Sequence, residues 1–145
     1  MNRRQFLQTS IALGSLQVLG ARKERRHPSL TLGFSLYGMK TLKTEKALRQ
    51  LSKIGYDSVE LCLNDGWDAA PKNVTTKRRK ELRILLDDLG LKLTALMINI
   101  KVNGEQKVSI AKIREAAQIG HDLCPDNPPV IESVGGGGKM GRGKK

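Results

Sequence analysis

Hydrophobic and polar residues follow two patterns between residues 30 and 134, and each pattern predicts a different element. Four short apolar stretches predict strands at residues 30–37, 58–63, 91–100 and 128–134. Between them, apolar residues recur at helical spacing, after the candidate caps Thr44, Thr75 or Thr76, and Ser109. The predicted inward faces of the three helices are Ala47, Leu48, Leu51 and Ile54; Leu82, Leu85, Leu86 and Leu89; and Ile110, Ile113, Ala116 and Ala117.

Three glycines mark a repeat along this region. Gly55, Gly90 and Gly120 are separated by 35 and 30 residues, and each precedes a predicted strand. Glycine readily adopts the left-handed conformation that ends a helix. The pattern therefore predicts a repeated β/α unit with parallel strands and right-handed crossovers. Both an open doubly wound sheet and an arc of a closed barrel fit this pattern.

Four segments, at residues 32–37, 54–61, 89–96 and 119–123, resemble successive units of one barrel family. This family is the xylose-isomerase-like barrels of the sugar phosphate isomerase/epimerase superfamily, and the most specific segment is Ile-Gly-Tyr-Asp-Ser-Val-Glu-Leu. The resemblance implies a partial (β/α) TIM-type barrel with about four parallel strands and three helices. We expect residues 27–134 to form its N-terminal half, since a whole barrel takes roughly 250 residues.

The resemblance also implies an activity, the isomerisation or epimerisation of a sugar or sugar phosphate. In this family the reaction is a proton transfer or hydride shift on a sugar polarised by a divalent metal. The family's metal ligands, carboxylates and a histidine, come from later strands, which would lie beyond residue 145. We therefore expect that this chain lacks the metal ligands and, alone, the metal-dependent turnover of the family. DNA-cleaving barrels of the endonuclease IV type share the fold and also need such ligands.

The histidines and cysteines of the chain do not form a recognisable metal motif. His27 lies in a basic linker and His121 follows a predicted helix stop, so neither is at a strand end. Cys62 and Cys124 have no C-x-x-C spacing, and we expect both to be free thiols.

Barrel active sites lie at the carboxyl ends of strands, which gives a short set of candidate pocket residues. These residues are Tyr37, Glu60, Asn64, Trp67, Asn99 and Glu132.

Three of these candidates have a structural alternative. Glu60 lies in an otherwise apolar strand, where a buried carboxylate needs a partner or acquires a raised pKa. It either contacts a substrate or holds a neighbouring strand, and for Glu132 we favour the structural role. Trp67 either stacks on a sugar or covers the top of the barrel, and we favour the cover.

Residues 1–26 predict a twin-arginine-type signal peptide followed by a basic linker. Arg3 and Arg4 precede Phe6 and Leu7, and an apolar run at 11–21 follows. We expect an exported protein, periplasmic or, if the signal is uncleaved, associated with the membrane. An amphipathic N-terminal helix of the domain is the alternative.

The net charge of +12 is concentrated at the two ends of the chain. Residues 1–26 carry +5, residues 135–145 carry +4, and the middle carries +3. The alternative function is therefore a small non-catalytic binding module whose basic ends contact nucleic acid or anionic surfaces. For the barrel itself we expect no specific nucleic-acid partner. We do expect self-association, because a four-stranded parallel sheet has two open edges.

Residues 135–145 consist mainly of glycine and lysine and predict a flexible tail. The spacing from Gly138 to Gly143 and Lys144 matches a phosphate-binding loop, but Lys145 stands where that motif has Ser or Thr. We favour a shortened or shifted reading frame, which replaces the rest of the barrel by this tail.

Overall fold

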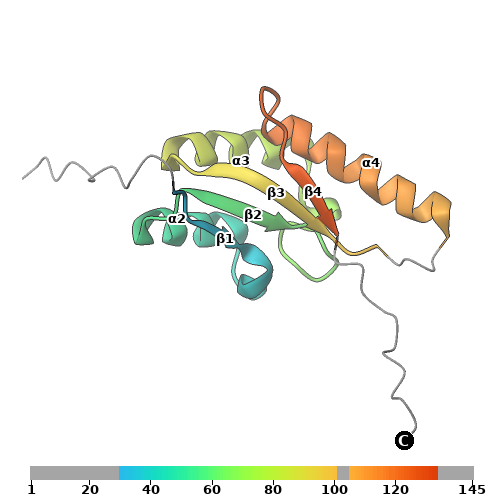
Figure 1. Ribbon diagram of the computed structural model, residues 1–145, viewed down its shortest axis with the longest axis horizontal. Coiled ribbons are helices and arrows are strands. Elements are labelled where there is room, and N and C mark those ends of the chain that lie inside the picture. The colour runs from blue at the N-terminus through green and yellow to red at the C-terminus, as the bar shows by residue number, and fades with distance from the viewer. Residues whose placement is uncertain (1–29, 101–104, 134–145) are drawn as a thin grey trace, which may run out of the picture. The chain divides into compact units, whose positions relative to one another are not determined.

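The computed structural model describes residues 30–100 and 105–133 (Figure 1). The predicted signal residues Arg3, Arg4, Phe6 and Leu7 and the tail 135–145 lie outside the described residues. Within the described ranges, no helix combines the length and the apolar character needed to cross a membrane.

The described residues form an α/β fold with one parallel sheet in the order β1-β2-β3-β4. This confirms the predicted four strands and three helices. The strands are β1 (Gly33–Ser35), β2 (Ser58–Cys62), β3 (Lys92–Ile98) and β4 (Val130–Ser133). The helices are α2 (Thr44–Ile54), α3 (Thr76–Leu89) and α4 (Gln106–Leu123), and two 3-10 turns are η1 (Leu36–Met39) and η2 (Pro71–Asn73).

The strand order favours a barrel arc over an open doubly wound sheet. In a doubly wound sheet the order reverses at a switch point, which places helices on both faces. Here the order never reverses, and right-handed crossovers in one direction keep the helices on one face. In agreement, α3 contacts both α2 and α4. Among the described residues, no further strand pairs with the outer edge of β1 or β4.

The core lies between the helices and one face of the sheet. Val59, Leu61 and Leu96 point to this face and are almost fully buried. They pack in one cluster with helix residues that include Leu48, Leu51, Leu82, Leu86, Ile119 and Leu123. Because side chains alternate along a strand, the residues between them point to the opposite face, away from the helices.

Two of the three predicted helix stops are confirmed. Gly55 and Gly90 follow α2 and α3 with φ of 103° and 63°, the left-handed conformation expected of them. Gly120 is instead buried inside α4, which continues to Leu123, so this prediction was wrong. Its place is set by close packing, because a Cβ there would lie 3.1 Å from Cγ of Pro129.

One predicted helix cap is confirmed and two are wrong. Thr75 caps α3 and accepts a hydrogen bond from the backbone of Arg78. Ser109 lies inside α4, which already begins at Gln106. Thr44 is the first residue of α2, and its backbone and hydroxyl both donate to Oδ2 of Asp68, each at 2.9 Å. A carboxylate from a distant loop thus replaces the local cap.

The predicted inward face of α4 is largely wrong. Ala116 is buried, but Ile110 and Ile113 are 39% and 40% exposed, and the other buried residues are Ile119, Gly120 and Leu123. The N-terminal half of α4 extends past the ends of the strands, so the sheet covers only its C-terminal half (Figure 1).

Ile54 and the first strand also differ from prediction. Ile54, predicted inward at the end of α2, is 63% exposed because the helix ends at this residue. The first strand is limited to Gly33–Ser35, because the chain turns into η1 at Leu36.

Substitution of Asp68 tests whether its carboxylate stabilises the fold by capping α2. Ion pairs and hydrogen bonds hold its pKa well below the usual range despite its burial. The Asp68→Asn variant should lose about 2 kcal/mol of unfolding free energy at pH 7, measured by urea denaturation. A depressed pKa stabilises the fold above the unfolded-state value of about 3.9, so the difference should shrink as pH falls below it. The exposed Asp88→Asn is the control, and equal loss in both variants contradicts the account.

Candidate functional site

The carboxyl ends of the strands and the loops after them bring the predicted site residues into two groups. Glu60 in β2 and Glu132 in β4 lie on the sheet face away from the helices. Asn64, Trp67 and Asn99 follow β2 and β3 and line a pocket that does not include the two glutamates. Tyr37, in η1, lies beside Trp67.

A carboxylate pair occupies the open face of the sheet. Ser35 in β1 is the register partner of Glu60, and its hydroxyl donates to Oε1 of that carboxylate. Glu60 is in turn paired with Ala95 of β3, which has a small side chain. Glu132 lies beyond β3 on the same face and still interacts with Glu60. The register partner of Glu132 on β3 is Met97, so Glu132 lies diagonally across β3 from Glu60.

The pKa of Glu60 is raised by burial and by Glu132, and it is lowered in part by Ser35. Partial burial is the largest cause, because it disfavours the charged carboxylate. The hydrogen bond from Ser35 opposes it, while hydrogen bonding and charge repulsion from Glu132 raise the pKa further. The pair can therefore hold one proton at a pH where an isolated glutamate has lost it. A protonated and an ionised carboxyl side by side are suited to acid–base chemistry.

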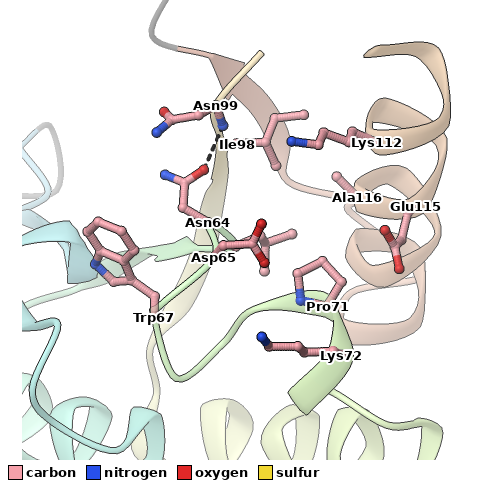
Figure 2. A pocket seen from close by; sticks show the side chains of 11 residues that line it. Asn64, Asp65, Trp67, Pro71, Lys72, Ile98, Asn99, Lys112, Glu115 and Ala116 are labelled. Atoms are coloured by element: carbon pink, nitrogen blue, oxygen red, sulfur yellow. Dashed lines mark hydrogen bonds between the residues drawn. The ribbon is translucent and has the colours of Figure 1, made fainter. Parts of the chain in front are cut away.

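The pocket at the ends of β2 and β3 has a volume of about 460 Å³ (Figure 2). Asn64 builds its wall and is only 7% exposed. Its Oδ1 accepts from the backbone N–H of Asn99 at 2.6 Å, and its Nδ2 donates to the sulfur of Cys62 at 3.2 Å. The amide thus joins the ends of two neighbouring strands. The lining residues are Leu63, Asn64, Asp65, Trp67, Pro71, Lys72, Ile98, Asn99, Lys112, Glu115 and Ala116.

Charges of both signs face this pocket. Asp65 and Lys72 come from the β2–α3 loop and Lys112 and Glu115 from α4, with the ammonium of Lys112 directed toward Ile98 (Figure 2). None of these four charged groups forms an ion pair within the part of the chain that the structure describes. They are therefore available to polar ligand groups.

Trp67 connects the loops after β1 and β2. Its ring stacks on Tyr37 with 5.1 Å between centroids, and its Nε1 donates to the Tyr37 carbonyl at 3.1 Å. The ammonium of Lys40 lies 4.2 Å from the centroid of the Trp67 ring. A sugar that stacked on this ring would compete with Tyr37 or Lys40 for it, which favours the covering role.

An ion cluster fixes the loop that carries Trp67. Arg78 of α3 forms a forked pair with Glu45 of α2, at 2.8 and 3.1 Å, and also pairs with Asp68 of the loop. Lys43 pairs with the other oxygen of Asp68 at 2.8 Å. The loop is thereby tied to both neighbouring helices.

The described residues do not by themselves fit a resident divalent metal. Across residues 30–100 and 105–133, no group of three or more His, Cys, Asp or Glu comes together. Glu60 and Glu132 are a pair, and His121 lies in the last turn of α4, away from a strand end. Cys62 and Cys124 are free thiols, as predicted, and burial raises the pKa of both.

Sequence reasoning missed several residues of this site. Three of the missed residues lie in the same strands or loop as predicted ones: Ser35 in β1, and Asp65 and Lys72 in the loop after β2. Their signal is therefore their position near a strand end. Lys112 and Glu115 carry no such signal, because they reach the pocket only through the packing of α4.

The strand order, the single helical layer and the polar strand ends define a segment of a TIM-type (β/α) barrel. Among solved structures, the chain is similar to that of the probable 3-DHS dehydratase AsbF, involved in petrobactin synthesis, from Bacillus anthracis. The TM-score is 0.54 at 13% sequence identity, over 72% of this chain and 38% of that protein. The chain thus spans well under half the length of this relative. The likeness supports the TIM-type barrel fold.

Comparisons by sequence give no further assignment. No family model matches the chain, and no curated protein matches it in sequence.

Replacing Glu60 tests whether the ionised form of its carboxyl group destabilises the fold. A raised pKa means that the folded state binds more protons, so stability falls as pH rises through that pKa. Glu60→Gln should therefore be more stable than the wild type at pH 8, by about 1 kcal/mol or less, and nearly equal at pH 4. Thermal unfolding at the two pH values measures this. Glu81→Gln on α3 is the control, and lower stability of Glu60→Gln at pH 8 would show a purely structural role.

Proposed function

We propose that the described residues are part of a sugar isomerase/epimerase-like barrel, in which Glu60 and Glu132 transfer protons on a sugar or sugar phosphate. The observation that carries the proposal is the interacting carboxylate pair on the open sheet face, with a raised pKa at Glu60. The resemblance of residues 54–61 to that superfamily and the barrel-like fold support it.

The pair suits a proton transfer next to a carbonyl group. The ionised carboxylate removes a proton from the carbon beside the sugar carbonyl, and that C–H electron pair forms the new C=C bond. The protonated carboxyl donates its proton to the carbonyl oxygen, which gives an enediol. Return of a proton to the other carbon, or to the opposite face of the same carbon, gives the isomer or the epimer, while the carboxylate that gave its proton to the carbonyl oxygen takes a hydroxyl proton of the enediol and the C=O bond forms again. Both steps need one protonated and one ionised group at the same pH.

The position of Glu132 near the end of its strand agrees with this role, and Glu60 lies on the same face at the middle of β2. In TIM-type barrels the functional groups lie at the carboxyl ends of the strands, and the sheet face away from the helices is the barrel interior. Glu132 is the third residue of the four-residue β4, and Glu60 is the third of five in β2. Ser35 holds the Glu60 carboxylate from the neighbouring strand.

The alternative function, a basic binding module, rests on different residues. The charge that suggests it lies mainly in residues 1–26 and 135–145, outside the described ranges. The pocket at the strand ends carries charges of both signs, which does not favour a polyanion.

Solvent hydrogen exchange tests the proposal at its first chemical step. In D₂O, the wild-type chain should catalyse deuterium incorporation beside the carbonyl of D-fructose 6-phosphate or D-fructose, seen as loss of proton NMR signal. Glu60→Gln and Glu132→Gln should each slow this exchange by about 100-fold or more, while Glu81→Gln should leave it unchanged.

Two results would contradict the proposal. The first is the absence of exchange above the buffer rate in the wild type. The second is equal exchange in the wild type and in both glutamine variants, which would place the chemistry elsewhere.

A further inference from the structure

A second hollow, of about 410 Å³, lies next to the pocket of Figure 2 and shares Trp67 and Lys72 with it. We refer to it as the lysine hollow. It is formed by the turn before α2 and the loop after β2, and it does not include Glu60 or Glu132. Its lining residues are Lys40, Thr41, Leu42, Lys43, Gly66, Trp67, Asp68, Lys72 and Asn73.

The lysine hollow has an excess of positive charge. Three lysines and one carboxylate line it, and that carboxylate, Asp68, is already paired with Lys43 and Arg78. Within the described ranges, Lys40 and Lys72 have no acidic partner at ion-pair distance. Two ammonium groups are therefore left to attract an anion.

Lys40 is held in place without an ion pair. Its ammonium lies over the Trp67 ring, where the ring's negative face attracts a cation. Gly66 also lies near this ammonium, with φ of 89°, and a Cβ at this glycine would come within 3.3 Å of Cε and Nζ of Lys40. Because Gly66 has no side chain, the ammonium end of Lys40 has room beside it. An ammonium positioned in this way loses little freedom when an anion binds.

Lys72 contributes from the opposite end of the loop. It is the second residue of the short turn η2, and its ammonium extends toward the side on which Trp67 lies (Figure 2). Thr41 and Asn73 add polar groups to the same wall. The amide of Asn73 donates to the carbonyls of Trp67 and Asp68, which fixes that part of the wall.

We propose that the lysine hollow binds a phosphate group, free or as a monoester, whose oxygens pair with the ammonium groups of Lys40 and Lys72. Lysine is a compact charge with three donors, which suits phosphate oxygens. Trp67 is in contact with Tyr37 and Lys40, so an aromatic base has no free ring on which to stack. The site is separate from the carboxylate pair, and the inference does not depend on the proposed reaction.

Calorimetric titration of the full chain at low ionic strength tests the inference, with inorganic phosphate, glucose 6-phosphate and glucose as probes. The two phosphates should bind and glucose should not bind at this site. Lys40→Met and Lys72→Met should each weaken phosphate binding about tenfold, the value of one charge-assisted hydrogen bond. Lys46→Met, on the exposed side of α2, is the matched control and should bind like the wild type. Thermal unfolding checks that the variants fold.

The fluorescence of Trp67 gives an independent readout, because it is the only tryptophan of the chain. Phosphate bound at the Lys40 ammonium, which lies over the Trp67 ring, should change the emission, with the same midpoint as the calorimetric titration. Tighter binding of glucose 6-phosphate than of phosphate would identify a phosphorylated sugar as the ligand, and equal binding would identify free phosphate.

Unchanged phosphate binding in the double variant Lys40→Met/Lys72→Met, or no binding by the wild type, would overturn the inference. If the wild type binds phosphate but does not catalyse deuterium exchange, only the proposed reaction is overturned.

Discussion

The hydrogen bonds and ion pairs of the Asp68 carboxylate hold together the start of α2, the loop after β2 and α3. The carboxylate accepts hydrogen bonds from the first residue of α2, pairs with Lys43, and pairs with Arg78 of α3. Three segments of the chain that are distant in sequence therefore meet at one side chain. Without this charge, the first turn of α2 loses its cap and the loop after β2 loses its attachment to two helices.

The pocket at the strand ends and the lysine hollow both depend on how the loop after β2 is held in place. Trp67 and Lys72 line both of them, and the ion cluster of Asp68 and Arg78 holds the loop between these two residues. Asn64 fixes the start of the same loop through the backbone of Asn99. A loop of turn-forming residues is thus fixed at its start by Asn64 and near its middle by Asp68. This is the usual way in which a rigid scaffold positions a binding loop.

The regular elements could be predicted from the sequence because their signals are local. Periodicity located α2 and α3, the cap Thr75 located the start of α3, and the left-handed glycines Gly55 and Gly90 located the ends of both helices. The errors arose where tertiary contacts decide. Asp68 replaces a local cap from 24 residues away, and Gly120 is placed by its contact with Pro129 rather than by a helix end.

The candidate site was predictable to the same extent. A carboxylate in an apolar strand identified Glu60, and the position after the end of the second predicted strand identified Asn64 and Trp67. Strand order and side-chain alternation were needed to show that Glu60 and Glu132 share a face without sharing the pocket. Lys112 reaches that pocket from a helix, and no local pattern predicts such an approach.

The central claim is that Glu60 and Glu132 form an interacting acid–base pair on the open face of the sheet. The most direct test is a pH titration of the side-chain carboxyl carbons by ¹³C NMR, on the wild type and on Glu132→Gln. The account predicts that Glu60 titrates above the ordinary pKa of a glutamate, and that Glu132→Gln lowers this pKa, because it removes the repelling charge. Titration of Glu60 at the ordinary pKa, unchanged in the variant, would contradict the claim.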